Sequence, residues 1–219
     1  MNLKFLFSIL LFIAFISQSY AATSPSSPAT TLATQLDAIQ TMRADFIQTV
    51  YDNRGKAIQQ TNGRMAIDRP GKLRWEIIKP IPQLIIANQS RLWIYDADLE
   101  QVTIRSLTIA AGEAPALLLS HSNTALDRDY QVTLLPAQRA DGLQWFRLVP
   151  KQADNMFASV DLGFANHQIQ QMRLQDHLGH ATVIQFKRAQ VNQPLPATLF
   201  KLGKLPANVD VIDETKQKQ

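Results

Sequence analysis

The chain has 219 residues, 46 % of them hydrophobic, with 22 Lys and Arg against 18 Asp and Glu. This length predicts a single domain, and this apolar fraction excludes wholesale disorder. The formal net charge of +4 is too small to indicate nucleic-acid binding, which needs clustered basic residues. Because the chain contains no cysteine, disulfides, thiolate metal sites, cysteine nucleophiles and a lipid-modified cysteine are excluded.

The first 21 residues have the pattern of a cleavable secretory signal peptide. Lys4 is the one charge before an apolar run over residues 5–16, and a small-x-small cleavage motif ends at Ala21. The run is shorter than the roughly 20 residues that span a bilayer. We therefore expect cleavage after Ala21 and export of a soluble mature protein. The less favoured alternative is an uncleaved anchor.

Residues 22–30 are rich in Ser, Pro and Thr, a composition typical of a linker. A helix is expected to follow, with Thr30 or Thr31 as its N-cap. Its apolar residues share one stripe at helical spacing: Leu32, Leu36 and Ile39. A second, short helix is predicted over residues 115–120, because Pro115 suits the first turn of a helix.

From residue 42 onward, apolar and polar side chains alternate with a period of two, which predicts half-buried strands. Their spacing is typical of an all-β meander, and Asn62-Gly63 is expected to form a hairpin turn. The expected strands lie at 42–49, 64–69, 73–78, 84–86, 92–95, 102–104, 131–135, 143–149, 158–162, 168–174 and 181–186, with 199–202 as a late edge strand. We predict one domain over 31–212 and a polar tail over 213–219.

A single antiparallel sheet of this kind must cover its apolar face. The sequence offers two short helices for that purpose. This combination predicts a mainly β fold, a strongly curved sheet with a helical lid over an apolar cavity. Such a cavity suits an apolar ligand. Trp75, Trp93 and Tyr95 are either ordinary core residues or the floor of the cavity.

The residues that catalysis would need form no recognisable pattern. Asp176, His177 and His180 are interpreted as turn residues rather than metal ligands, and Asp96 and Asp98 as turn formers. The sequence has no nucleophile elbow and no glycine-rich phosphate loop. We therefore predict no catalytic residue, no metal site and no cofactor.

Basic residues concentrate between positions 43 and 79. They form either a solvated outer face of the sheet or a patch for an acidic partner or membrane head groups. Arg69 differs, because it shares a face with Met65 and Ile67 immediately before Pro70. An arginine on an apolar face needs partners for its donors. It either bonds to backbone carbonyls of a covering helix and holds a lid shut, or extends to solvent.

Several short motifs, in their order and spacing, closely resemble the LolA family of periplasmic outer-membrane lipoprotein carriers. They are Phe46-Ile47-Gln48, Arg69-Pro70 followed by Trp75, Leu92-Trp93-Ile94-Tyr95, Leu99-Glu100-Gln101-Val102, Pro115 followed by Leu117-Leu118-Leu119, Asp176 to Gly179, Phe186, and the ending Phe200 to Val211. The likeness covers nearly the whole chain after the signal peptide. It implies an incomplete, strongly curved antiparallel β-barrel (a half-barrel) whose hydrophobic cavity is closed by short helices.

The resemblance also implies a function. A family member takes mature triacylated lipoproteins from the inner-membrane ABC transporter LolCDE, shields their acyl chains across the periplasm, and passes them to the outer-membrane receptor LolB. Cargo that an Asp after the lipidated cysteine retains at the inner membrane is not expected to travel. We expect a monomer without enzymatic activity. LolB itself is excluded, because it needs an N-terminal cysteine; the alternative is a lipid- or lipoprotein-sensing regulatory module of the same fold.

Site residues follow from the same resemblance. Arg69 matches the family arginine that bonds to the lid helices and toggles between open and closed forms. The matching lid positions are Leu36, Leu119 and Ser120. The match and the strand alternation together place the cavity at Phe46, Met65, Leu73, Trp75, Ile77, Trp93 and Met172.

Overall fold

A computed structural model describes residues 26–88, 90–107, 115–120, 126–136, 141–152 and 155–216. The α-helices are α1 (Pro28–Asp37) and α3 (Leu126–Asp129), and the 3-10 helices are η1 (Pro115–Leu119), η2 (Ala197–Phe200) and η3 (Glu214–Lys216). The strands are β1 (Thr41–Tyr51), β2 (Ala57–Asp68), β3 (Lys72–Lys79), β4 (Gln83–Asn88), β5 (Arg91–Asp96), β6 (Gln101–Ser106), β7 (Tyr130–Leu134), β8 (Gln144–Pro150), β9 (Phe157–Ala165), β10 (Gln168–Asp176), β11 (Ala181–Val191) and β12 (Asp210–Asp213).

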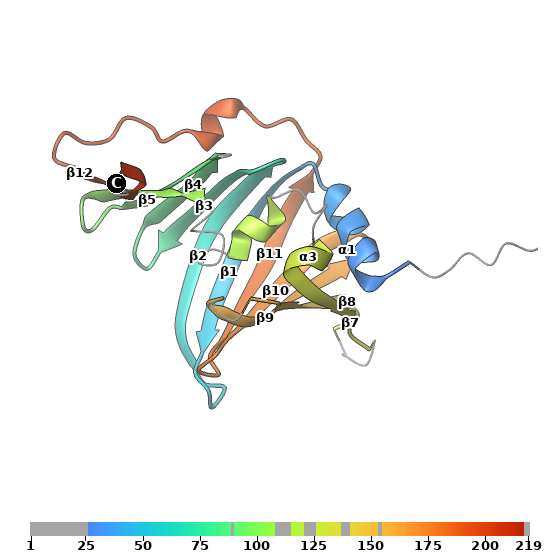
Figure 1. The fold of residues 1–219 in the computed structure, drawn as a ribbon. Helices are drawn as coiled ribbons and strands as arrows, with labels where there is room; N and C mark the ends of the chain where they lie inside the picture. Colours follow the sequence, from blue (N-terminus) through green and yellow to red (C-terminus); the bar gives the residue numbers. More distant parts are fainter. Residues whose placement is uncertain are drawn as a thin grey trace, which may run out of the picture.

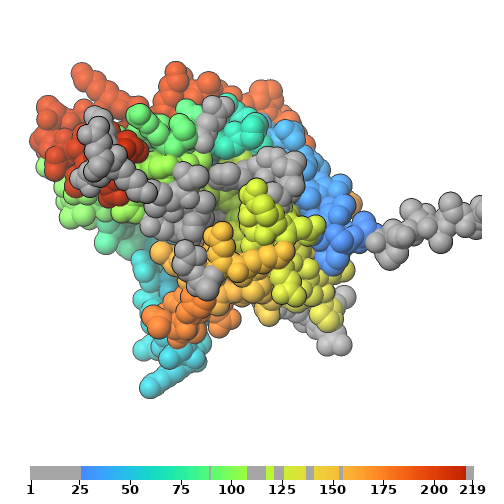
Figure 2. Space-filling model, viewed as in Figure 1, coloured from blue at the N-terminus to red at the C-terminus, as the bar shows by residue number. Residues whose placement is uncertain are grey.

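All twelve described strands belong to one sheet, in the order β12-β6-β5-β4-β3-β2-β1-β11-β10-β9-β8-β7. Neighbouring strands in the sheet are antiparallel, except for the parallel pair β12–β6 at one edge. The sheet is open and strongly curved, with α1, η1 and α3 on its concave side (Figure 1). In the space-filling view α1 (blue) adjoins the yellow-green atoms of α3 on that side (Figure 2). The predicted mainly β fold with a helical lid is confirmed.

The two faces of the sheet differ sharply in chemistry. Paired residues on neighbouring strands share a face. One row across the concave face is entirely apolar and buried: Met42, Ile67, Leu73, Ala87 and Leu92. The adjacent row faces the convex side and mixes charged with apolar side chains: Arg43, Ala66, Arg74, Ile86 and Trp93. The period of two in the sequence thus separates an inner surface from an outer one.

Helix α1 begins earlier than the sequence predicts. Its N-cap is Ser27, whose hydroxyl accepts a hydrogen bond from the Thr30 backbone N–H at 3.1 Å, and Pro28 occupies the first turn. Neither Thr30 nor Thr31 is the cap, and residues 28–30 are helical rather than linker. A Ser-Pro pair is a good helix start, but the linker-like composition of the segment concealed it.

Asn62-Gly63 forms no hairpin turn, contrary to prediction. Both residues lie within β2, and the turn before that strand is at Gly55, whose N–H bonds to the Asp52 carbonyl oxygen. A Cβ at position 63 would overlap the Phe46 ring and the Glu76 carbonyl oxygen. Gly63 is therefore needed for close packing within the sheet and not for a turn.

The C-terminal segment, residues 192–216, differs from prediction in two places. Residues 197–200 form η2 instead of an edge strand, and Phe200 is buried against the convex face of β3 and β4. Asp213 closes β12, and Glu214 pairs with Arg105 at 2.9 Å. The predicted polar tail therefore starts inside ordered structure.

Candidate functional site

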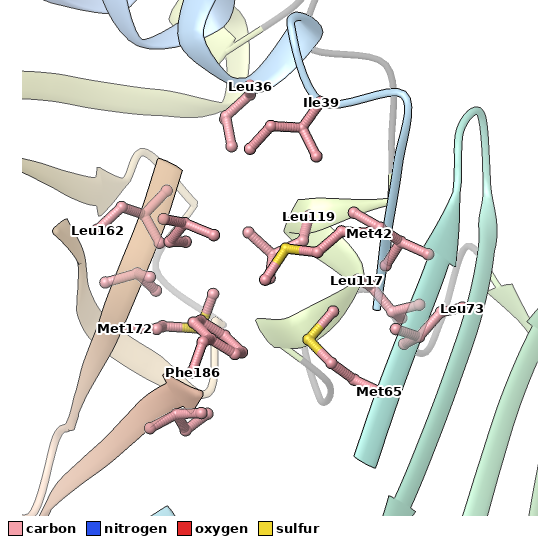
Figure 3. Packing of buried hydrophobic residues seen from close by; sticks show 14 of the residues in the cluster. Leu36, Ile39, Met42, Met65, Leu73, Leu117, Leu119, Leu162, Met172 and Phe186 are labelled. Carbon is pink, nitrogen blue, oxygen red and sulfur yellow. The ribbon is translucent and has the colours of Figure 1, made fainter. Parts of the chain in front are cut away.

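The concave face, α1 and η1 enclose a cluster of buried apolar side chains that we call the apolar interior. Side chains from opposite arms of the sheet point toward one another, with Leu36 and Ile39 above them (Figure 3). Of the predicted cavity residues, five are buried in this cluster and Ile77 packs against its margin; the five are Phe46, Met65, Leu73, Trp75 and Met172. The structure thus brings six of the seven residues together, and their contact with a ligand stays a prediction.

Phe46 and Trp75 form the aromatic centre of the apolar interior. Their rings stack with centroids 3.8 Å apart and planes inclined by 20°. Phe46 lies on β1 opposite Gly63, so the ring occupies the space that a side chain at 63 would fill. Trp75 lies on β3 opposite Met65. Because Gly63 leaves room for the Phe46 ring, the large side chains of β1, β2 and β3 pack together on one surface.

Trp93 is the predicted cavity residue that lies elsewhere. It pairs with Ile86 on β4 and Ile104 on β6, and this register places it on the convex face. Its neighbour Leu92 faces the apolar interior and is buried. The four consecutive apolar residues from Leu92 to Tyr95 give no contrast between faces, so only the pairing with β4 fixes which side chain points inward.

The predicted lid residues Arg69 and Leu36 are in contact. The Arg69 guanidinium donates from Nη1 to the Leu36 carbonyl oxygen at 2.6 Å and to Asp37 Oδ1 at 3.1 Å. The Arg69 side chain is only 5 % exposed. A cation at the C-terminus of α1 also complements the helix dipole. Of the two interpretations of Arg69, the contact with a helix carbonyl is the one observed.

Burial lowers the pKa of the Arg69 guanidinium, and the nearby Asp37 carboxylate opposes that shift. Arginine nevertheless stays protonated at physiological pH. Its charge is therefore permanent, and the bond to α1 depends on geometry rather than on titration.

The turn between β2 and β3 also holds the second lid element. The Gly71 N–H donates to the Ser120 carbonyl oxygen at 2.6 Å, directly after η1. The Ser120 hydroxyl donates to the Leu117 carbonyl oxygen at 3.0 Å, and Leu119 is buried in the apolar interior. One three-residue turn, 69–71, therefore anchors both α1 and η1.

Two further contacts, of α1 and of the segment directly after it, had no signal in the sequence. Gln35 Nε2 donates to Gln144 Oε1 at 2.6 Å, which joins α1 to the start of β8 across 109 residues. Asn192 accepts from the Gln40 N–H at 2.8 Å and donates to the Ala38 carbonyl oxygen at 2.9 Å. Both contacts join residues far apart in the chain, and a single sequence carries no information about such pairs.

The convex face carries a different kind of recess. A cleft of about 650 Å³ lies between β1, β2, β3, β11 and the C-terminal segment. Its charged lining consists of Arg43, Asp45, Arg64, Arg74, Glu76 and Arg188. Arg74 lies 3.3 Å from Glu76, and Arg188 pairs with Asp45. Three of the basic residues noted in the sequence, Arg43, Arg64 and Arg74, thus lie on the outer face, away from the apolar interior.

Hydrogen bonds hold both histidines of the turn at Asp176. His180 Nδ1 lies 2.8 Å from Asp176 Oδ2, and His177 Nε2 lies 2.9 Å from the Asn155 carbonyl oxygen. Within the described ranges, no group of three His, Asp or Glu could hold a metal ion. In that same part of the chain, no helix has the length and apolar character to cross a bilayer.

An open, strongly curved sheet whose apolar concave face is covered by short helices provides a surface suited to an apolar ligand. Residues 37–203 match the family model described as outer membrane lipoprotein carrier protein LolA. The chain belongs to this family.

Two relatives, both named outer-membrane lipoprotein carrier protein, extend the match. The one from Dechloromonas aromatica is 42 % identical over 175 residues, which cover 80 % of this chain and 82 % of the relative. The one from Nitrosospira multiformis is 38 % identical over 215 residues, which cover 98 % and 100 %. A solved structure of an uncharacterized conserved protein from Thermus thermophilus has a TM-score of 0.53 at 13 % identity, covering 84 % and 99 %, and it shares the fold.

Proposed function

We propose that the protein is a periplasmic carrier that binds the acyl chains of mature lipoproteins in its apolar interior. The observation that carries this proposal is the buried concave face, where apolar residues from both arms of the sheet meet under a lid made of α1 and η1. The names of the relatives support lipoproteins as the cargo. A carrier needs no catalytic group, and we propose no enzymatic activity.

The energetics suit reversible binding. Burial of acyl chains contributes about 0.8 kcal/mol per CH₂, so ten buried groups contribute about 8 kcal/mol. The lid is tied down through Arg69, Gly71 and Gln35, and a typical hydrogen bond contributes only about 1 kcal/mol net. Chain burial therefore offsets the broken hydrogen bonds and the displacement of Leu36 and Leu119, while lid closure still competes with the ligand and lowers its affinity.

The lid is the proposed point of control. Arg69 holds α1, Gly71 holds Ser120, and Leu36 and Leu119 fill the top of the apolar interior. In the open form these contacts break and acyl chains replace Leu36 and Leu119 against the concave face. The cavity residues that would contact the chains are Phe46, Met65, Leu73, Trp75, Ile77 and Met172.

The family resemblance supports the finer steps of the proposal. The carrier receives cargo from LolCDE and delivers it to LolB as a monomer, and it does not receive lipoproteins with a retention Asp after the lipidated cysteine. Removal of residues 1–21 precedes these steps. Residues 22–27 then lie before α1, and the domain proper runs from α1 to β12.

The function is tested with spheroplasts that export a labelled lipoprotein. We expect the purified mature protein to release that lipoprotein into the supernatant as a soluble complex. A lipoprotein with Asp after its lipidated cysteine is the matched control and should stay with the membrane. Equal amounts of soluble lipoprotein with and without the protein would reject carriage.

A further inference from the structure

One buried hydroxyl on the concave face lacks a partner among the described residues. Thr61 on β2 is 4 % exposed, and its Oγ1 makes no hydrogen bond within that part of the chain. Thr61 shares the concave face with Gly63 and Met65, because all three alternate along the same strand. A buried polar group without a hydrogen bond costs free energy, and such groups are rare in native proteins. This one therefore calls for an explanation.

A second polar side chain lies directly opposite. Gln48 on β1 pairs with Thr61, so both side chains lie on the concave face of adjacent strands. Side chains at such positions have Cβ atoms about 4.5–5.5 Å apart and readily interact. Nonetheless, the Gln48 amide does not hydrogen-bond to Thr61 in the structure. The two groups are neighbours, but neither satisfies the other.

The pair marks the border of the apolar surface. On the lid side, the concave positions of β1 are Met42, Ala44 and Phe46, all apolar and buried. Beyond Thr61, β2 is exposed up to its start at Ala57. The β1–β2 hairpin extends away from α1 at that end (Figure 1). Thr61 and Gln48 thus lie where an acyl chain that follows β1 from the lid would reach its polar end.

We propose that Thr61 and Gln48 form a polar subsite that binds the ester or amide carbonyl groups of the cargo's acyl chains. This inference rests on the proposed function. An acyl chain supplies a carbonyl oxygen at its end, which can accept from the Thr61 hydroxyl and the Gln48 amide. The hydrocarbon then lies over Phe46 toward the lid, and the remainder of the cargo leaves at the far rim.

The test compares two ligands that differ in the carbonyl alone. Monomyristoylglycerol carries an ester, and the corresponding tetradecyl ether of glycerol has no carbonyl. Dissociation constants for both are measured by calorimetry with the mature protein and with Thr61→Val. We expect the wild type to prefer the ester by at least about three- to tenfold, the effect of one hydrogen bond. In Thr61→Val the preference should fall to the part that the Gln48 amide still supplies, while the ether affinity is unchanged.

Stability supplies an independent readout. Valine has nearly the shape of threonine but no hydroxyl, so Thr61→Val should raise the urea midpoint of the ligand-free protein. Thr61→Ser keeps the hydroxyl and should restore the ester preference. Thr49→Val is the matched control, because Thr49 lies on the neighbouring strand β1 and alternates onto the convex face. It should leave the ester preference unchanged.

Each result decides the matter. Equal affinity of the wild type for ester and ether would overturn the subsite and leave carriage of apolar chains intact. An unchanged ester preference in Thr61→Val, or a lower urea midpoint, would overturn it as well. If the wild type bound neither ligand, the proposed function would fail, and the subsite with it.

Discussion

The concave and convex faces of the sheet use the same strands for opposite purposes. On the concave face of β9, Leu162 packs into the apolar interior. On the convex face, the neighbouring Asp161 receives two hydrogen bonds from Arg147, at 2.7 and 2.8 Å. The concave face is therefore apolar and covered by helices, while the convex face carries ion pairs. This separation allows a carrier to open one surface without weakening the other.

Each face also presses one large aromatic ring against a glycine. Phe46 covers Gly63 on the concave side, and Trp145 covers Gly163 on the convex side. The ring of Phe46 stacks on Trp75. The ring of Trp145 is instead covered by the Arg173 guanidinium, 4.3 Å from its centroid. In both places a ring packs on a glycine, but the inner ring, Phe46, has an apolar partner and the outer ring, Trp145, has a cationic one.

The largest expected effect comes from adding a side chain at Gly63, where the Phe46 ring packs on the concave face. In Gly63→Ala the new methyl group would overlap both the Phe46 ring and the backbone oxygen of Glu76. Because a backbone atom cannot move aside, we expect a loss of at least about 3 kcal/mol in the free energy of unfolding. Urea denaturation measures it. Gly163→Ala is the control: the atoms nearest its methyl, 2.9 Å away, belong to the Trp145 side chain and not to the backbone, so it should lose less. Equal losses would contradict the packing described.

The next effect concerns the lid. Arg69→Leu removes the bonds to the Leu36 carbonyl and to Asp37. The closed, empty form competes with cargo binding, so weakening it by about 1.4 kcal/mol should slow cargo release about tenfold while binding persists. Transfer of bound lipoprotein to receptor-bearing membranes measures the rate. Arg64→Leu, on the convex face, should transfer normally, and an unaltered rate in Arg69→Leu would remove Arg69 from the control of release.

A smaller effect is expected on the convex face. Asp161→Asn replaces a buried carboxylate that holds Arg147. Loss of the charge-assisted pair should lower the free energy of unfolding by about 1 kcal/mol. The affinity for an acyl ligand should not change, because Asp161 faces away from the apolar interior. Calorimetry on the same sample checks both, and a parallel loss of affinity would show that the two faces are coupled.

The smallest effect depends on pH. Burial raises the pKa of Asp176, but the hydrogen bonds that its carboxylate accepts from His180 and Leu178 outweigh this and hold the pKa below its ordinary value. Stability from this group is therefore present above the unfolded pKa of about 3.9 and is lost as the pH falls through the folded value. In Asp176→Asn the unfolding midpoint should therefore fall less steeply as the pH is lowered than it does in the wild type. If the midpoints of both proteins fell equally, the turn would contribute nothing to stability.

The alternation of residues predicted the concave surface wherever polar and apolar side chains contrast, as at Phe46 and Leu73. It failed at Trp93, where four apolar residues in a row leave the face to the register with β4. The Asn-Gly turn signal misassigned Gly63, because a glycine that admits a distant ring looks like a glycine that makes a turn. Arg69 was recognisable as a cation on an apolar face, whereas Gln35 and Gln144 form a contact that local pattern cannot reveal.

The tryptophans allow the most direct test of where cargo binds. Trp75 lies in the apolar interior, while Trp93 and Trp145 lie on the convex face. Three variants, each with one tryptophan retained and the others changed to Phe, are titrated with a bromine-labelled acyl lipid, which quenches fluorescence on contact. The account predicts strong quenching of Trp75 and none of Trp93 or Trp145. Quenching of the convex tryptophans with Trp75 unaffected would contradict it.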